Sequence, residues 1–218
     1  MSAPAASNTR ATDWNSYYQS VPATAKLTRQ YTTAMLVDAI RRYAQPQAEA
    51  LALVEIGGAN SCFVDRLLAE FAPRSYDVVD TNQYGLDLLA RRAGTASPVR
   101  LHNQSVLAMS LPASADVVFS VGLVEHFQPQ ETRAAVRAHF DVVRPGGIVI
   151  ITFPTPTPLY RATRGLIESI GQWKFHDERP LMPVEVVQAI GERGELLFQK
   201  TLWPLILTQH LVVARKLR

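Results

Sequence analysis

Short apolar runs alternate with helical segments between residues 51 and 153, and this alternation constrains the fold more than any other feature of the sequence. The runs at 51–56, 76–79, 116–121 and 148–153 are rich in Val, Ile and Leu, as buried parallel strands are. The segments between them carry apolar residues at helical spacing. Strands that alternate with helices predict right-handed crossovers and a doubly wound, mostly parallel α/β sheet.

Three further segments add strands to this sheet. Residues 99–101 predict a weaker strand, and residues 196–203 and 207–215 predict two closing strands. The sequence Pro145-Gly-Gly147 predicts a turn before the run at 148–153. In a doubly wound sheet, ligands bind beyond the carboxyl ends of the strands, so functional residues are expected there.

The segments outside the alternation define the expected domain organisation. Apolar residues at helical spacing predict that residues 1–45 form an N-terminal helical extension. Residues 46–218 are expected to form the main domain. Within it, residues 154–182 interrupt the alternation with a stiff Pro154-Thr-Pro-Thr-Pro158 stretch, and we expect them to form an insertion.

Composition excludes several classes of protein. The chain has 218 residues, of which 47% are hydrophobic, and its formal charge of +3 is scattered. We therefore expect no nucleic-acid or membrane partner. Cys62 is the only cysteine, and the five histidines have no metal-ligand spacing, so neither a disulfide nor a metal site is expected. The first ten residues are small and polar, which favours a cytoplasmic location.

A glycine-rich turn follows the run at 51–56. Gly57 and Gly58 let the backbone approach a ligand closely, although ordinary strand-to-helix turns also contain such glycines. The G-x-G-x-x-G fingerprint of dinucleotide folds fails here, because its second and third glycines are Ala59 and Cys62. Glu55 would repel a pyrophosphate and attract a cation. A ligand with an ammonium and a sulfonium group would be attracted here, and S-adenosylmethionine carries both.

A second acidic residue ends the next strand. Asp80 lies 23 residues after Gly57, where a carboxylate can bind both hydroxyls of a ribose. A helix N-cap is the competing role for this residue. We expect Thr81 to pack on the adenine, and Ser105 or Val106 to flank its other side.

These segments resemble a known family. The similarity covers roughly residues 51–153, and it is carried by Val54-Glu-Ile-Gly-Gly58, Val78-Val-Asp80, Asp116-Val-Val-Phe-Ser-Val-Gly-Leu-Val-Glu-His126 and Val143-Arg-Pro-Gly-Gly147. These look like successive motifs of class I S-adenosylmethionine-dependent methyltransferases. The resemblance implies a seven-stranded sheet that ends in an antiparallel hairpin. The chain departs from the family where Ala59 and Ser61 replace frequent glycines.

The resemblance also implies roles for single residues. It implies that Glu55 meets the amino end of the methionine moiety, that Gly57 lies beneath the cofactor and that Asp80 holds the ribose. It further implies that backbone near Ser120 faces the methionine moiety.

Methyl transfer depends mainly on alignment, and a base is needed only for an acceptor such as a hydroxyl. His126 is the candidate base, although histidines at such positions are also often structural. We expect substrate contacts from residues of the N-terminal extension and of the insertion, with ordinary packing or solvated positions as the alternatives: Tyr17, Tyr18, Tyr160, Arg161 and His176. The two N-terminal tyrosines would make the extension a lid.

The sequence thus predicts a methyltransferase that moves a methyl group from S-adenosylmethionine to an O or N atom and releases S-adenosylhomocysteine. The expected acceptor is a small molecule or a glycan or natural-product intermediate. Two alternatives stay open at this point: an NAD-dependent oxidoreductase, and a catalytically silent methyltransferase-like subunit. Oligomeric state is not predicted.

Overall fold

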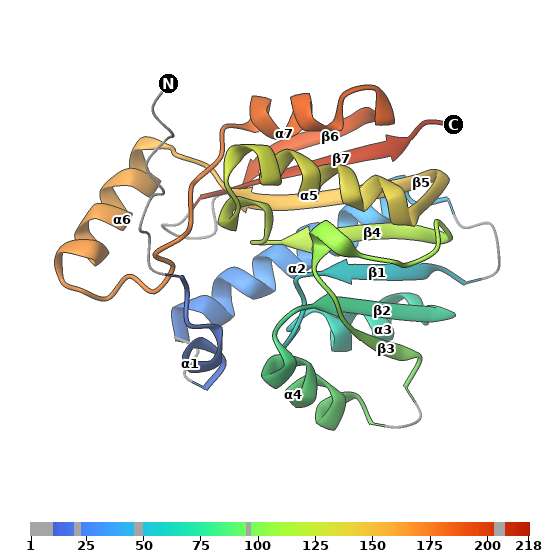
Figure 1. The fold of residues 1–218 in the computed structure, drawn as a ribbon, viewed down its shortest axis with the longest axis horizontal. Helices are drawn as coiled ribbons and strands as arrows, with labels where there is room; N and C mark the ends of the chain where they lie inside the picture. Colours follow the sequence, from blue (N-terminus) through green and yellow to red (C-terminus); the bar gives the residue numbers. More distant parts are fainter. Residues whose placement is uncertain (1–10, 20–22, 46–49, 95–96, 203–207) are drawn as a thin grey trace, which may run out of the picture.

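A seven-stranded sheet in the order β3-β2-β1-β4-β5-β7-β6 organises the molecule (Figure 1). This computed structural model describes residues 11–19, 23–45, 50–94, 97–202 and 208–218, and the side chains of residues 23–27 are outside the description. The first five strands are parallel, whereas β7 pairs antiparallel with both β5 and β6. The predicted fold class, including the closing antiparallel hairpin, is confirmed.

The elements follow one another in the expected alternation. The strands are β1 (Ala52–Ile56), β2 (Ser75–Asp80), β3 (Val99–Asn103), β4 (Ala115–Val121), β5 (Val143–Pro154), β6 (Gly194–Leu202) and β7 (Gln209–Lys216). The helices are α1 (Trp14–Gln19), α2 (Ala23–Tyr43), α3 (Val64–Phe71), α4 (Gln83–Ala93), α5 (Pro129–Val142), α6 (Pro158–Ser169) and α7 (Pro183–Ile190). Three short 3-10 helices are η1 (Val106–Ala108), η2 (Val124–His126) and η3 (Gly191–Arg193).

Helices cover both faces of the sheet, and each face has its own apolar core. Successive residues of a strand point to opposite faces, so Leu53 packs with α2, α3 and α4, whereas Val54 packs with α5 and α7. The central strands β1 and β4 are buried on both faces, which explains their nearly continuous apolar sequence. Among the helices that the structure describes, none is both long and apolar enough to cross a membrane.

Two local expectations were wrong. Pro145-Gly-Gly147 does not form a separate turn, because it lies inside β5 opposite a register shift between Ala115 and Val117. Helix α3 begins only at Val64, because the Ser61 hydroxyl accepts a hydrogen bond from the Phe63 amide at 3.0 Å and holds residues 61–63 in a turn.

The insertion is also more regular than expected. It contains α6, which projects at one end of the molecule on the same side as α1 (Figure 1). The Thr157 side chain caps this helix by accepting from the Tyr160 amide at 3.1 Å, and Pro158 occupies its first turn. A capping threonine followed by proline is typical of a helix start, so residues 157–158 begin a helix instead of continuing an extended stretch.

The start of α4 gives a stability prediction close to the site. Asn82 caps this helix by accepting a hydrogen bond from the Gly85 amide at 2.7 Å. We expect Asn82→Ala to lower the free energy of unfolding by about 1 kcal/mol, because that amide loses its partner. Chemical denaturation measures this. An unchanged stability would show that the cap contributes nothing.

Candidate cofactor and acceptor site

The turn after β1 requires glycine at both of its first positions. Gly57 has a φ of +80°, in the left-handed region, and its amide donates to the Val79 carbonyl at 2.8 Å. A Cβ on Gly58 would lie 2.6 Å from the carboxyl carbon of Glu55. The turn therefore lies directly on the Glu55 side chain, and its backbone is free of side-chain bulk at these two positions.

Glu55 lies beneath this turn rather than on its outer surface. Its side chain is buried, and Oε2 accepts a hydrogen bond from the Tyr76 hydroxyl at 2.7 Å. Burial raises the pKa of Glu55 to about 7, although hydrogen bonds from Tyr76 and Ser61 oppose this. Glu55 points to the same face of the sheet as Tyr76. That Glu55 meets the cofactor's amino group stays a prediction.

The raised pKa of Glu55 predicts a dependence of stability on pH. Since the folded chain holds this proton more tightly than the unfolded chain, Glu55 lowers the stability as pH rises from about 4.5 to about 7. In Glu55→Gln, we expect the slope of unfolding free energy against pH in this window to be less negative than in the wild type, by at most about 1.4 kcal/mol per pH unit. Urea titrations from pH 4.5 to 7.5 test this, and parallel slopes would contradict it.

Asp80 ties the turn after β1 to the turn after β2. Its Oδ2 accepts from the Ala59 amide at 3.0 Å, and its Oδ1 accepts from the Asn82 amide at 2.8 Å. Burial nevertheless raises the pKa of Asp80, so these backbone donors do not fully compensate for its desolvation. The N-cap expected as the competing role belongs to Asn82 instead.

The other residues expected around a nucleoside lie on the neighbouring strand ends. Thr81 is exposed next to Asp80. The Gln104 amide donates to the Asp80 carbonyl at 3.1 Å, which brings the end of β3 beside Asp80. Ser105 caps η1 through the Leu107 amide, and Val106 is buried in the core beneath it.

The side chain of Ser120 has a structural role, distinct from the role that the resemblance implies for its backbone. The hydroxyl is completely buried and lies 2.9 Å from Nε2 of His139 on α5. Burial lowers the pKa of His139 to about 4, so the imidazole is neutral and this pair is structural. Only the backbone of Ser120, near the carboxyl end of β4, remains available for the role that the resemblance implies.

Helix α1 connects this corner with the end of β4. Tyr18 lies against the glycine turn and α4, since a Cβ on Gly85 would be 2.8 Å from its ring and 2.7 Å from the Cβ of Ala59. Burial, and next the charge of Asp80, raise the pKa of the Tyr18 hydroxyl. Trp14, on the same helix, packs its ring 5.1 Å from His126.

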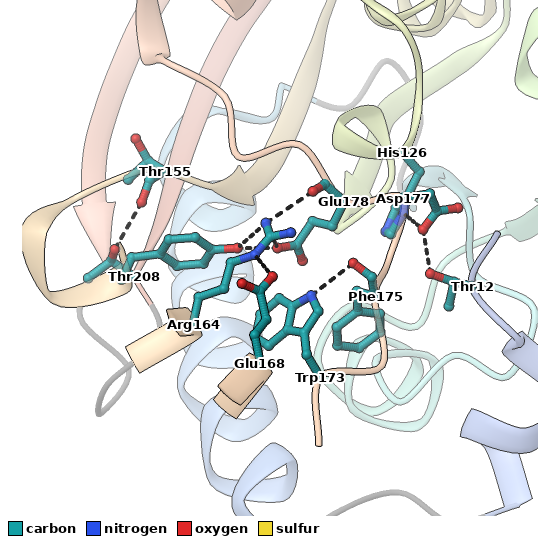
Figure 2. Close-up of polar contacts among 11 residues, drawn as sticks. Thr12, His126, Thr155, Arg164, Glu168, Trp173, Phe175, Asp177, Glu178 and Thr208 are labelled. Carbon is teal, nitrogen blue, oxygen red and sulfur yellow. Dashed lines mark hydrogen bonds and ion pairs between the residues drawn. The ribbon is translucent and has the colours of Figure 1, made fainter. Parts of the chain in front are cut away.

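His126 forms a hydrogen-bonded chain with the insertion and the N-terminal segment. Its Nδ1 lies 2.9 Å from Oδ1 of Asp177, which also accepts a hydrogen bond from the Thr12 hydroxyl (Figure 2). Burial by itself would lower the pKa of His126, but the bond to Asp177 and the charge of Glu125 raise it above its ordinary value. The side chain of His126 is 11% exposed.

Tyr160 belongs to a second group of hydrogen-bonded side chains, next to the group of His126, Asp177 and Thr12. Its hydroxyl donates to Glu178, and the Arg164 guanidinium lies 3.6 Å from the same carboxylate (Figure 2). The side chains of Arg161 and His176 are exposed and belong to neither of these two hydrogen-bonded groups. The structure therefore brings His126, Tyr17 and Tyr18 together around α1 and leaves Arg161 and His176 outside this group.

Several residues of this region were missed in the sequence. Asp177 and Glu178 stand next to His176 in a polar run, and the chain turns these two side chains inward instead of the histidine. Glu125 directly precedes His126 and is buried at the end of β4. Trp14 and Phe175 are aromatic residues whose positions depend on how α1 meets the insertion, and no local pattern marks them.

The chain was compared with known proteins. Residues 53–147 match the family model described as a methyltransferase domain. This part of the chain, with its strand order, therefore resembles class I S-adenosylmethionine-dependent methyltransferase domains. No curated protein matches the sequence.

Solved structures of methyltransferases share the fold of this domain. Magnesium protoporphyrin IX methyltransferase from Synechocystis PCC 6803, solved with S-adenosylhomocysteine, has a TM-score of 0.72 at 13% identity, over 93% of this chain and 92% of its own. The N-methyltransferase NodS from Bradyrhizobium japonicum WM9, also with S-adenosylhomocysteine, has a TM-score of 0.65 at 13% identity, with 87% of each chain covered. The 1,6-didemethyltoxoflavin-N1-methyltransferase from Burkholderia thailandensis has a TM-score of 0.69 at 15% identity, over 94% of this chain and 86% of its own. The resemblance to class I methyltransferases is thereby confirmed.

Proposed function

We propose that the chain transfers a methyl group from S-adenosylmethionine to an O or N atom of a small molecule or a glycan or natural-product intermediate. The observation that carries the proposal is the hydrogen bond that the Ala59 amide donates to Asp80, which joins the glycine turn and a half-buried carboxylate at adjacent strand ends. Two of the similar structures are described as N-methyltransferases, and one of these holds 1,6-didemethyltoxoflavin, which supports a small acceptor.

The residues at these strand ends fit the cofactor. Asp80 is half-buried, and backbone donors do not fully compensate for its desolvation, so two ribose hydroxyls would complete its hydrogen bonding. Gly57 and Gly58 would lie beneath the cofactor, with Glu55 supporting the turn from below. Thr81, Ser105 and Val106 would surround the adenine, and backbone near Ser120 would face the methionine moiety. When bound, S-adenosylmethionine supplies an electrophilic methyl group on a sulfonium.

His126 is the proposed base. Because Asp177 engages Nδ1, it orients the imidazole and stabilises its charged form, and Nε2 is then the nitrogen that takes a proton from the acceptor. A carboxylate that orients a histidine in this way is a recurring feature of proton-transfer sites.

The N-terminal extension, residues 1–45, is the proposed lid of the cofactor-binding domain, residues 46–218. Its helix α1 reaches from the glycine turn, through Tyr18, to His126, through Trp14. The insertion at 154–182 is the proposed substrate-facing element. We propose acceptor contacts for Tyr17, Tyr18, Tyr160, Arg161 and His176, of which Arg161 and His176 are the exposed members.

The proposed partner is the small acceptor, with no nucleic acid and no membrane, and the proposed compartment is the cytoplasm. The low and scattered net charge of +3 supports the first part. The single cysteine, Cys62, supports the second, because disulfides mark oxidising compartments.

A turnover assay tests the proposal. The chain is incubated with S-adenosylmethionine and a panel of small amines, alcohols and amino sugars, and S-adenosylhomocysteine and methylated products are detected by mass spectrometry. We expect acceptor-dependent formation of both products in equal amounts. Tight binding of S-adenosylhomocysteine without turnover on any acceptor would favour a silent methyltransferase-like subunit instead.

A further inference from the structure

Glu125 is a buried carboxylate at the carboxyl end of β4. Its side chain is 1% exposed, and its Oε2 has no hydrogen-bond partner among the residues that the structure describes. Its Oε1 lies 3.5 Å from the position of a Cβ on Gly122, so the carboxylate lies against the turn that follows β4. A buried carboxylate without a partner is strongly unfavourable, which indicates that a partner is to be supplied.

The charges around Glu125 do not balance. Two further carboxylates, Asp177 and Glu178, interact with it electrostatically. Asp177 is paired with His126, and Glu178 is paired with Arg164. When all three carboxyl groups are ionised and His126 is protonated, these five groups carry three negative charges and two positive charges. One negative charge is left over, and with a neutral His126 two are left over.

Arg179 does not supply the missing cation. Its guanidinium forms an ion pair with Glu185 at 2.8 Å. Its contact with Glu125 is through the backbone, where the Arg179 amide donates to the Glu125 carbonyl at 3.0 Å. Arg179 thus fixes the backbone of Glu125, while its guanidinium is engaged by Glu185.

The surroundings of His126 are aromatic as well as acidic. The Trp14 and Phe175 rings lie 5.1 Å and 6.3 Å from the imidazole of His126, and Tyr17 lies 5.2 Å from Phe175. Aromatic faces and carboxylates both attract organic cations, whereas neither gives an alcohol a comparable gain. Burial raises the pKa of Glu125 to about 8, so a cation would also draw this carboxyl into its ionised form.

We propose that the acceptor of the proposed methyl transfer is a protonated amine, whose ammonium group is bound by the carboxylate of Glu125. One N–H bond of the ammonium breaks, its proton passes to Nε2 of His126 and its electron pair stays on nitrogen. That pair forms the new N–CH3 bond, while the electron pair of the broken C–S bond stays on sulfur. His126 returns the proton to solvent after release of the methylated ammonium product, so charge and atoms balance.

Calorimetry on the full chain saturated with S-adenosylhomocysteine tests this proposal. The probes are three pairs that differ only in an amino or hydroxyl group: ethylamine and ethanol, phenethylamine and 2-phenylethanol, and glucosamine and glucose. In the wild type, we expect at least one amine to bind ten times more tightly than its hydroxyl counterpart. In Glu125→Gln, we expect that preference to fall below twofold.

Two controls make the outcome decisive. Glu131→Gln removes a carboxylate from the exposed start of α5, and it should keep the full amine preference. S-adenosylhomocysteine should bind the wild type, Glu125→Gln and Glu131→Gln with equal affinity, and a loss of that binding in the wild type would count against the methyltransferase function itself. With cofactor binding intact, the absence of any amine preference in the wild type, or its persistence in Glu125→Gln, would overturn the proposal.

Discussion

Replacing His126 with alanine is expected to lower kcat by about 10²-fold to 10⁴-fold while the affinity for S-adenosylhomocysteine stays unchanged, if His126 takes the acceptor's proton. The expectation rests on the bond between Nδ1 of His126 and Asp177, which orients the ring and stabilises the imidazolium. Steady-state kinetics on an acceptor found in the panel, together with calorimetry, measures both quantities.

Asp177→Asn separates a base from a structural histidine. Without the carboxylate, the pKa of His126 falls, because the bond to Asp177 is among the effects that raise it. The ascending limb of the pH–rate profile should therefore move to lower pH. A variant His126→Ala that keeps full turnover, or that unfolds together with a loss of cofactor binding, would contradict the role as a base.

Replacing Asp80 with alanine is expected to have the second large effect, which is a weaker affinity for the cofactor. We expect S-adenosylhomocysteine to bind more weakly by about 1–3 kcal/mol, because a half-buried charged acceptor for the ribose hydroxyls is lost. This corresponds to roughly a fivefold to 150-fold rise in Kd. Asp87→Ala is the matched control, since Asp87 is exposed on α4 and its carboxylate bonds only to Gln83 among the described hydrogen bonds.

Asp80 also holds the Ala59 and Asn82 amides, so the fold of the variant must be checked. Thermal melting of Asp80→Ala without ligand shows whether the two turns stay in place. An unchanged Kd in a folded Asp80→Ala would remove Asp80 from the binding site. A similar rise in Kd for Asp87→Ala would show that the assay responds to the loss of any negative charge and not to the loss of a contact in the site.

The strand ends were predictable because parallel strands place consecutive sequence signals at one edge of the sheet. Gly57 and Asp80 each follow an apolar run, and adjacent pairing of β1 and β2 brings them together. The sequence does not show that the Tyr76 hydroxyl, on the neighbouring strand, donates a hydrogen bond to the Glu55 carboxylate on the same face of the sheet.

The acceptor side was less predictable, because its contacts join distant segments. His126 and Asp177 are 51 positions apart, and their meeting depends on how the insertion returns to the end of β4. In the run His176-Asp-Glu178, the chain direction decides which side chains face inward, and the sequence alone favoured the histidine. Helix α6 was missed because Pro158 was interpreted as part of an extended stretch, although proline is well suited to the first turn of a helix.

The central claim is that the glycine turn after β1 and Asp80 after β2 together bind S-adenosylmethionine. Calorimetric titration of the full chain with S-adenosylhomocysteine, and in parallel with NAD, tests it most directly. We predict micromolar binding of S-adenosylhomocysteine with one molecule per chain, and no heat of binding from NAD. Binding of NAD, or no binding of S-adenosylhomocysteine by the folded chain, would contradict the claim.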